Sequence, residues 1–220
     1  MCGRFTLSQP VEAIASTFQL PIIPELAPRY NIAPTQPVAT VLQTSAHERQ
    51  FQLLRWGLIP AWAKDATMGS RLINARAETV AEKPSFRSAF RHRRCLVIAD
   101  GFYEWRRQDG KKQPFYFRMQ NQQPFAFAGL WEHWQDPKGE AINSCTILTT
   151  EANELLQQIH ERMPVILNPK DYNLWLDPTV QPEQLQQLLQ PYSSTAMTSY
   201  PVSTKVNKPT NDTPELINSL

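Results

Sequence analysis

The stretch CLVIADGFYEW, residues 95–105, decides the fold, because two apolar segments meet in it at Asp100-Gly101, a dipeptide that favours a turn. The short apolar run at residues 95–99 predicts a buried strand. Residues 102–106 and 115–119, separated by the turn sequence Gln-Asp-Gly at residues 108–110, predict an antiparallel hairpin. We therefore expect a buried strand followed directly by a hairpin.

Further strands and helices are expected on both sides of this stretch. The patterns predict strands at residues 38–42, 51–56, 125–134 and 145–149, with a last strand ending near Val202. They predict helices at residues 10–18, 83–91, 151–160, 168–176 and 182–189, and a Pro-rich extended loop at residues 20–37. Strands in runs, with helices at irregular intervals, favour an α+β fold over a regular βαβ series. We expect one domain, residues 2–205, and a polar, loosely held tail at residues 206–220.

The composition argues against several classes of protein. A net charge of +2 by itself indicates no partner. The three cysteines have no paired spacing and form no cluster with zinc spacing, so neither a disulfide framework nor a metal site is expected. The N-terminus MCGRFTLSQP lacks the pattern of a signal peptide, and no run of about 18 apolar residues could span a membrane. We expect a cytoplasmic monomer without a metal or other cofactor.

Cys2 is the first residue that suggests chemistry. Removal of Met1 would leave an N-terminal cysteine, which carries an amine and a thiol on adjacent carbons. Their unperturbed pKa values, about 7.7–8.0 and about 8.5, give both groups sizeable reactive fractions near neutral pH. Such an aminothiol condenses with an aldehyde and closes a thiazolidine ring, whereas an acyl substrate would be attacked by the thiolate alone. The chemistry of Cys2 does not separate these two uses.

Three other segments contain candidate site residues. In LINARAET, residues 72–79, an extended backbone would point Asn74 and Arg76 to the same side. In DGFYEW, Glu104 lies between two aromatic residues, where loss of water should raise the pKa of its carboxyl towards the range of a general acid or base. His160 is expected at the C-terminal end of a helix, which favours the imidazolium. The basic stretch at residues 86–94 is either a solvated helix face or a phosphate-binding patch.

Seven segments, spread over residues 1–165, together resemble the SOS response-associated peptidase (SRAP) family: MCGRF, RYNIAP, WGLIPAW, INARAET, DGFYEW, TILTT and HERMPV. The resemblance implies an α+β fold with a β-rich, barrel-like centre flanked by short helices. It also implies a protein of the SOS and DNA damage responses that binds single-stranded DNA containing abasic sites and associates with the nucleoid when the DNA is damaged. The family's peptidase activity is interpreted as self-processing of Met1. Glu161 departs from the family pattern, in which Asp is expected more often.

The resemblance assigns a role to each candidate residue. Cys2 is expected to form a covalent thiazolidine crosslink with the sugar aldehyde of an abasic site, in a lyase-like reaction assisted by the other catalytic residues, Asn74, Glu104 and His160. The expected DNA-binding residues are Arg4, Asn31, Trp62, Arg76, Trp105, Thr149 and Arg162. Cys95 and Cys145 are expected to be core thiols. Two alternatives remain open, namely a thiol amidohydrolase or peptidase that acts through its N-terminal nucleophile, and a non-covalent single-strand-binding module.

Overall fold

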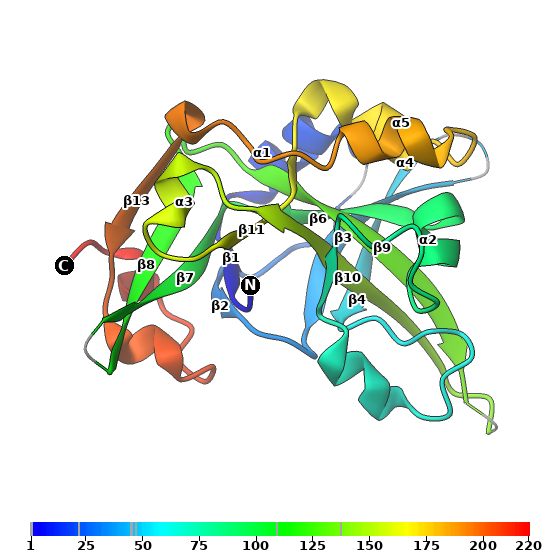
Figure 1. Ribbon diagram of the computed structural model, residues 1–220, viewed down its shortest axis with the longest axis horizontal. Coiled ribbons are helices and arrows are strands. Elements are labelled where there is room, and N and C mark those ends of the chain that lie inside the picture. The colour runs from blue at the N-terminus through cyan, green and yellow to red at the C-terminus, as the bar shows by residue number, and fades with distance from the viewer. Residues whose placement is uncertain (1, 22, 45, 47, 109, 137) are drawn as a thin grey trace.

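Five strands close into a barrel at the centre of the protein (Figure 1). The computed structural model describes residues 2–21, 23–44, 46, 48–108, 110–136 and 138–220. The barrel strands are β3 (Pro37–Gln43), β4 (Arg49–Trp56), β6 (Arg94–Ala99), β9 (Phe125–Gln135) and β10 (Ala141–Glu151). The pairings run β4–β3–β6–β9–β10, and β10 closes the circuit by pairing in parallel with β4.

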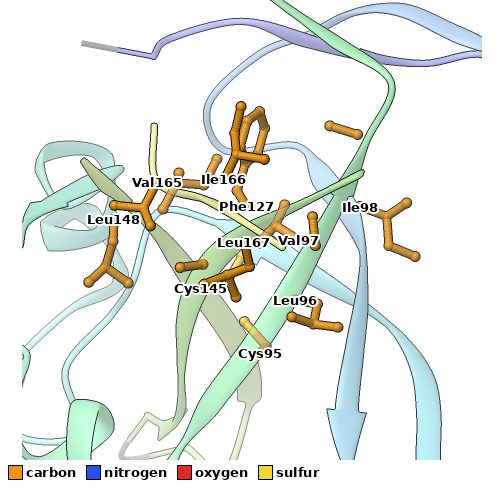
Figure 2. Packing of buried hydrophobic residues seen from close by; sticks show 14 of the residues in the cluster. Cys95, Leu96, Val97, Ile98, Phe127, Cys145, Leu148, Val165, Ile166 and Leu167 are labelled. Carbon is orange, nitrogen blue, oxygen red and sulfur yellow. The ribbon is translucent and has the colours of Figure 1, made fainter. Parts of the chain in front are cut away.

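The interior of the barrel is filled by apolar side chains from facing strands. Figure 2 shows Cys95 and its neighbours on β6 close to Phe127 on β9 and Cys145 on β10. Both thiols are fully buried and belong to no disulfide, which confirms their expected role in the core. The continuous burial of β6 explains why its sequence is an uninterrupted apolar run and not an alternating one.

Three short strands extend the barrel sheet beside β10 and β9. They are β5 (Asn74–Arg76), β11 (Arg162–Pro164) and β12 (Ile166–Leu167). β5 is parallel and β11 antiparallel to β10, so that Thr149 has Arg76 as its partner on one side and Pro164 on the other. This register brings Asn74, Arg76 and Arg162 to the same end of β10, although they are far apart in sequence.

A second, antiparallel sheet packs beside the barrel. Its order is β13 (Met197–Pro201), β8 (Lys111–Met119), β7 (Gly101–Gln108), β1 (Phe5–Leu7) and β2 (Arg29–Ile32). The chain passes from β6 to β7 through Asp100, so the predicted apolar strand and hairpin belong to different sheets. The Asp100 carboxylate accepts hydrogen bonds from the Ser8 and Gln9 backbone amides, at 2.5 and 3.0 Å, and from the Thr6 hydroxyl, which ties β1 to the turn.

The helices are short and lie around the two sheets. The α-helices are α1 (Val11–Phe18), α2 (Arg87–His92), α3 (Glu154–Gln157), α4 (Tyr172–Leu176) and α5 (Pro182–Gln187). Short 3-10 helices cover Ala66–Arg71, Pro169–Asp171, Ser194–Ala196, Thr204–Asn207 and Pro214–Ile217. None of the helices formed by the described residues has both the length and the apolar character that a membrane crossing requires.

Most of the expected elements are confirmed, as are the α+β class and the barrel-like centre. The Pro-rich loop expected at residues 20–37 was wrong in part, because Arg29–Ile32 forms β2. The helix expected at residues 151–160 is limited to Glu154–Gln157. The hairpin at residues 102–119 is present, although Asp109 of its expected turn lies outside the described residues.

The tail at residues 206–220 is not loosely held. Val206 and Leu216 are buried against Tyr103 and Tyr116 of the second sheet. The Asp212 carboxylate accepts hydrogen bonds from Arg29 Nε and from the backbone amides of Tyr30 and Asn31, at 2.5, 2.5 and 2.9 Å. Polar composition misled the prediction, because it does not reveal bonds to a strand about 180 residues away.

Candidate active site between the two sheets

Cys2 lies just before β1 and is fully buried. The Asn74 side-chain amide donates a hydrogen bond of 2.8 Å to the Cys2 carbonyl oxygen, which links the start of the chain to β5. Burial raises the pKa of the Cys2 thiol well above its ordinary value, and the nearby charge of Glu104 raises it further. The expected sizeable thiolate fraction at neutral pH is therefore wrong for this buried state, because a thiolate there has no water around it.

Glu104 is also buried, with 2 % of its surface exposed, in the middle of β7. Loss of water raises the pKa of its carboxyl, while the neighbouring His160 acts in the opposite direction by favouring the carboxylate. The direction expected from the sequence is thereby confirmed. A carboxyl group in this environment retains its proton to higher pH than an exposed one, which suits a general acid.

His160 follows α3 and does not belong to it, so the expected position at the end of a helix was wrong. A tight turn holds it instead, with the His160 amide donating to the Leu156 carbonyl at 2.8 Å. Its Nδ1 lies 2.9 Å from the Arg162 backbone amide and accepts a hydrogen bond from it. The same Nδ1 also lies 3.2 Å from the Arg162 carbonyl oxygen, so both contacts hold the ring against the backbone of Arg162.

An open cleft of about 780 Å³ lies beside these groups. Glu104 and His160 are on its wall, so the two titratable side chains face one space. The other residues that line it are Trp105, Arg107, Lys112, Ile159, Glu161 and Asn207. Cys2 is close enough to Glu104 for their charges to interact. The structure thus brings together Cys2, Asn74, Glu104 and His160 from four separate segments.

Asn74 contributes a second polar atom to this arrangement. Its Oδ1 is buried and accepts no hydrogen bond from any part of the chain that the structure describes. A buried acceptor without a donor costs free energy, about 1–3 kcal/mol. Since its Nδ2 already donates to the carbonyl of Cys2, Oδ1 is positioned to accept an N–H from a group bound beside that residue.

The expected phosphate-binding residues differ in how they are held. Arg76 is exposed at the end of β5. Arg162 donates to both carboxylate oxygens of Glu78, at 2.5 and 3.0 Å, and to the Thr149 carbonyl at 2.7 Å. Thr149 itself is fully buried, and its hydroxyl lies between the Ala75 carbonyl and Arg162. In this conformation, Thr149 orients Arg162 and presents no hydroxyl to the solvent.

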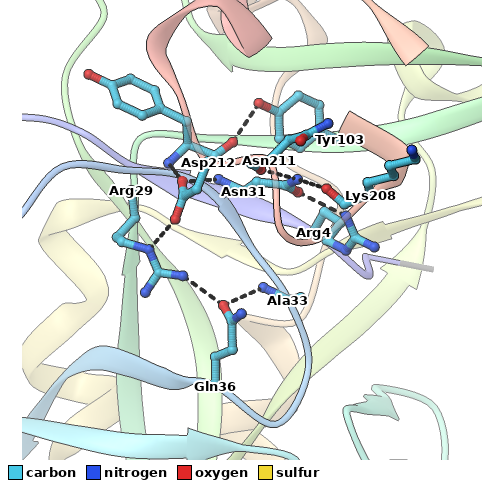
Figure 3. A network of polar contacts seen from close by, with 10 residues as sticks. Arg4, Arg29, Asn31, Ala33, Gln36, Tyr103, Lys208, Asn211 and Asp212 are labelled. Atoms are coloured by element: carbon cyan, nitrogen blue, oxygen red, sulfur yellow. Dashed lines mark hydrogen bonds and ion pairs between the residues drawn. The ribbon is translucent and has the colours of Figure 1, made fainter. Parts of the chain in front are cut away.

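Arg4 and Asn31 are part of a polar network that binds the C-terminal segment (Figure 3). The Asn31 side-chain amide donates to the carbonyls of Val206, Lys208 and Asn211, at 3.1, 3.0 and 2.7 Å. Arg4 donates to the Asn31 side chain at 2.9 Å and to the Val206 carbonyl at 2.8 Å. Asn31 is fully buried, so its side chain contacts protein and not solvent.

The two tryptophans expected to contact bases have different environments. Trp105 lines the cleft, and its indole Nε1 donates to the Asn207 side-chain oxygen at 2.8 Å. Trp62 is 59 % exposed and is not among the residues that line the cleft.

Sequence reasoning missed Asn207, for which the polar tail gave no signal. It also missed Arg107 and Lys112, which the basic residues on both sides of the hairpin turn could have indicated.

No group of His, Cys, Asp or Glu side chains within the described ranges of the chain is arranged to hold a metal ion.

A closed barrel joined to a second sheet, with a buried cysteine beside an acid and an imidazole, defines a mixed α/β protein with a thiol-containing site. The chain belongs to the SOS response associated peptidase (SRAP) family, whose sequence model matches residues 1–209. It is 48 % identical to "Abasic site processing protein YoqW" of Bacillus subtilis (strain 168), over 100 % of both chains. It is 34 % identical to "Abasic site processing protein HMCES" of Xenopus tropicalis, over 86 % of this chain and 65 % of that one.

Solved structures of similar proteins agree with the fold. A Bacteroides thetaiotaomicron protein is 27 % identical and superimposes with a TM-score of 0.88 over 100 % of both chains. A Bordetella bronchiseptica protein, also 27 % identical, gives a TM-score of 0.80 over 92 % of this chain and 100 % of that one. These likenesses and the family match confirm the resemblance seen in the sequence motifs.

Proposed function

We propose that this protein captures abasic sites in single-stranded DNA by forming a covalent thiazolidine through Cys2, after removal of Met1. One observation carries the proposal. The Asn74 side-chain amide donates a hydrogen bond of 2.8 Å to the Cys2 carbonyl oxygen, close to the buried Glu104, which lines the same cleft as His160. The names of the relatives, which are abasic site processing proteins, support DNA lesions as the substrate class. The crosslink would shield the lesion in the DNA damage response.

The first step is hydrolysis of the peptide bond between Met1 and Cys2. One water molecule is consumed, methionine leaves, and the nitrogen of Cys2 becomes an α-amine. This is the self-processing to which we attribute the peptidase activity of the family. The thiol is then adjacent to an amine whose pKa in water is about 7.7–8.0, so a neutral amine is available for attack.

Ring formation then needs no oxidant or reductant. The amine adds to the aldehyde carbon of the opened sugar, and the resulting hydroxyl leaves as water to give a Schiff base. The sulfur attacks the carbon of the protonated Schiff base, the electron pair of the C=N bond returns to nitrogen, and the thiol proton passes to a base. The net reaction joins aminothiol and aldehyde with loss of one water. Because both nucleophiles belong to Cys2, the second attack is intramolecular and therefore fast.

Glu104 is suited to the two proton transfers. Its raised pKa lets the neutral acid donate a proton to the departing hydroxyl, and the resulting carboxylate can accept the proton of the thiol. Because burial raises the pKa of the Cys2 thiol, the sulfur needs a base close by to accept its proton, and the Glu104 carboxylate is that base. We assign to Asn74 Oδ1 the positioning of the amine, and to the His160 imidazole the transfer of a proton from the C1 hydroxyl to the ring oxygen, which opens the sugar.

The DNA strand would be held by charged and aromatic groups around the cleft. We assign phosphate contacts to Arg76 and Arg162, and base stacking to Trp105 and Trp62. Arg4, Asn31 and Thr149 support binding from within the protein. Arg4 and Asn31 hold the C-terminal segment, and Thr149 orients Arg162.

A denaturing gel tests this proposal. The protein is incubated with single-stranded DNA carrying one abasic site, and a heat-stable shifted band is expected. Cys2→Ala should abolish the band, while Cys145→Ala, which removes a core thiol far along the chain, should retain it. Unshifted DNA with the wild-type protein would refute covalent capture. Turnover of amide substrates by that same protein would instead favour an N-terminal-nucleophile hydrolase.

Intact mass provides an independent check of the first step. The protein that forms the crosslink should lack the mass of Met1. A crosslink formed by protein that retains Met1 in full would exclude the thiazolidine, because the nitrogen of Cys2 would still be an amide.

A further inference from the structure

The hairpin β7–β8 presents two cations to the cleft. Arg107 and Lys112 both line it, and they are direct partners in the antiparallel register of the hairpin. Partners of this kind have side chains on the same face, with Cβ atoms about 4.5–5.5 Å apart. Like charges directly opposite one another are unfavourable, and no ion pair or hydrogen bond of either side chain occurs within the described part of the chain. An anion between them would remove this repulsion.

The charges around the cleft favour one wall for an anion. Arg107 and Lys112 are the Arg and Lys side chains among the described residues that line it. Glu161 lies on the lining as well, and its carboxylate repels a phosphate, whereas the buried Glu104 belongs to β7 of the hairpin itself, where loss of water raises the pKa of its carboxyl and favours the neutral acid. A phosphate entering the cleft is therefore attracted to the hairpin and repelled from the segment that carries Glu161.

The same wall contains an aromatic surface at a suitable position. Trp105 is two residues before Arg107 on β7, so the two side chains project from the same face, about 6.6 Å apart along the strand. The Trp105 indole Nε1 donates a hydrogen bond of 2.8 Å to Asn207 Oδ1, which fixes the orientation of the ring. A fixed aromatic ring beside a pair of cations matches the two parts of a nucleotide, its base and its phosphate.

We propose that Arg107 and Lys112 form a phosphate-binding subsite for the nucleic-acid strand that carries the lesion, next to a base stacked on Trp105. This inference rests on the proposed function and adds a second contact region to it. Arg76 and Arg162 belong to strands beside the barrel, whereas this pair belongs to the second sheet. In this proposal the strand contacts both sheets.

Equilibrium binding to a single-stranded oligonucleotide with a tetrahydrofuran abasic analogue tests the subsite, because the analogue lacks the aldehyde and cannot be crosslinked. The double variant Arg107→Gln/Lys112→Gln should bind more weakly. The slope of log affinity against log salt concentration should flatten by about 0.7, the value for one phosphate on a single strand. The matched control is Lys138→Gln/Lys170→Gln, which removes two exposed charges that do not line the cleft and should leave the slope unchanged.

Trimming the oligonucleotide gives a second readout. If the pair binds one phosphate of the strand, the effect of the double variant should disappear when the DNA on one side of the analogue is removed, and persist when the other side is removed. An unchanged salt slope, an equal change in the Lys138→Gln/Lys170→Gln control, or an effect that survives both trimmed substrates would overturn the subsite. A heat-stable crosslink formed by the wild-type protein would meanwhile keep the proposed function intact.

Discussion

Asp212→Ala tests whether the C-terminal segment is a structural part of the domain. The Asp212 carboxylate accepts hydrogen bonds from two backbone amides of β2 and from Arg29 Nε. A hydrogen bond to a charged group contributes about 1.5–3 kcal/mol. The ion pair with Arg29 is about a quarter to a third exposed, so solvent screening limits its share to about 1 kcal/mol or less. Counting the lower value for each amide, we expect a loss of about 3 kcal/mol in the free energy of unfolding.

Urea titration followed by tryptophan fluorescence measures this loss. The midpoint should fall while the slope m stays unchanged, because the folded state buries the same surface. For a chain of 220 residues, a change of about 3 kcal/mol corresponds to a melting temperature lower by about 6–12 °C. Asp171→Ala is the matched control, since its carboxylate makes no capping bond at α4. Equal midpoints for the two variants would refute the view that Asp212 anchors the segment.

The other predictions concern the site. Glu104→Gln should slow crosslinking by about 10²–10⁴-fold in quenched gels and leave affinity for the tetrahydrofuran oligonucleotide near normal; a matching loss of affinity would make Glu104 structural. Burial raises the pKa of Glu104 above its ordinary value of 4.5, so its contribution to stability falls as the pH rises beyond that value. The stability of Glu104→Gln relative to wild type should therefore increase as the pH rises above 4.5 in urea titrations, and a flat difference would contradict this. Asn207→Ala should weaken oligonucleotide binding more than Asn211→Ala, which removes a bond to Lys205 but none to Trp105; equal effects would exclude a positioning role. Trp62→Ala should weaken binding by about 1–3 kcal/mol if a base stacks there, and unchanged affinity would remove Trp62 from the DNA contacts.

The fold could be predicted where the signal was local. The apolar run of β6, the turn at Asp100 and the hairpin that follows depend on residues close together in sequence. Closure of the barrel could not be derived from such patterns, because the parallel pairing of β4 with β10 joins Arg55 and Trp56 to Ser144 and Cys145. The family resemblance supplied the expectation of a barrel-like centre, and the pairings confirm it.

The site was predicted by residue type and resemblance, and the structure added its geometry. Burial of Glu104 was expected from its aromatic neighbours and is confirmed. The contacts of Arg4 and Asn31 with the C-terminal segment were not foreseen, because each pairs with carbonyl groups more than 170 residues away. The roles of these residues in catalysis and DNA binding remain predictions that the experiments above test.

The sequence by itself determined the α+β class, the hairpin, the core thiols and the membership of a family, because these depend on short-range periodicity and on motifs in a fixed order. The tertiary structure alone decided that Cys2 is buried beside Asn74 and Glu104, and that Arg107 and Lys112 face the same cleft as His160. The physical reason is that desolvation and electrostatic attraction depend on distances in space, and strand pairing between remote segments sets those distances.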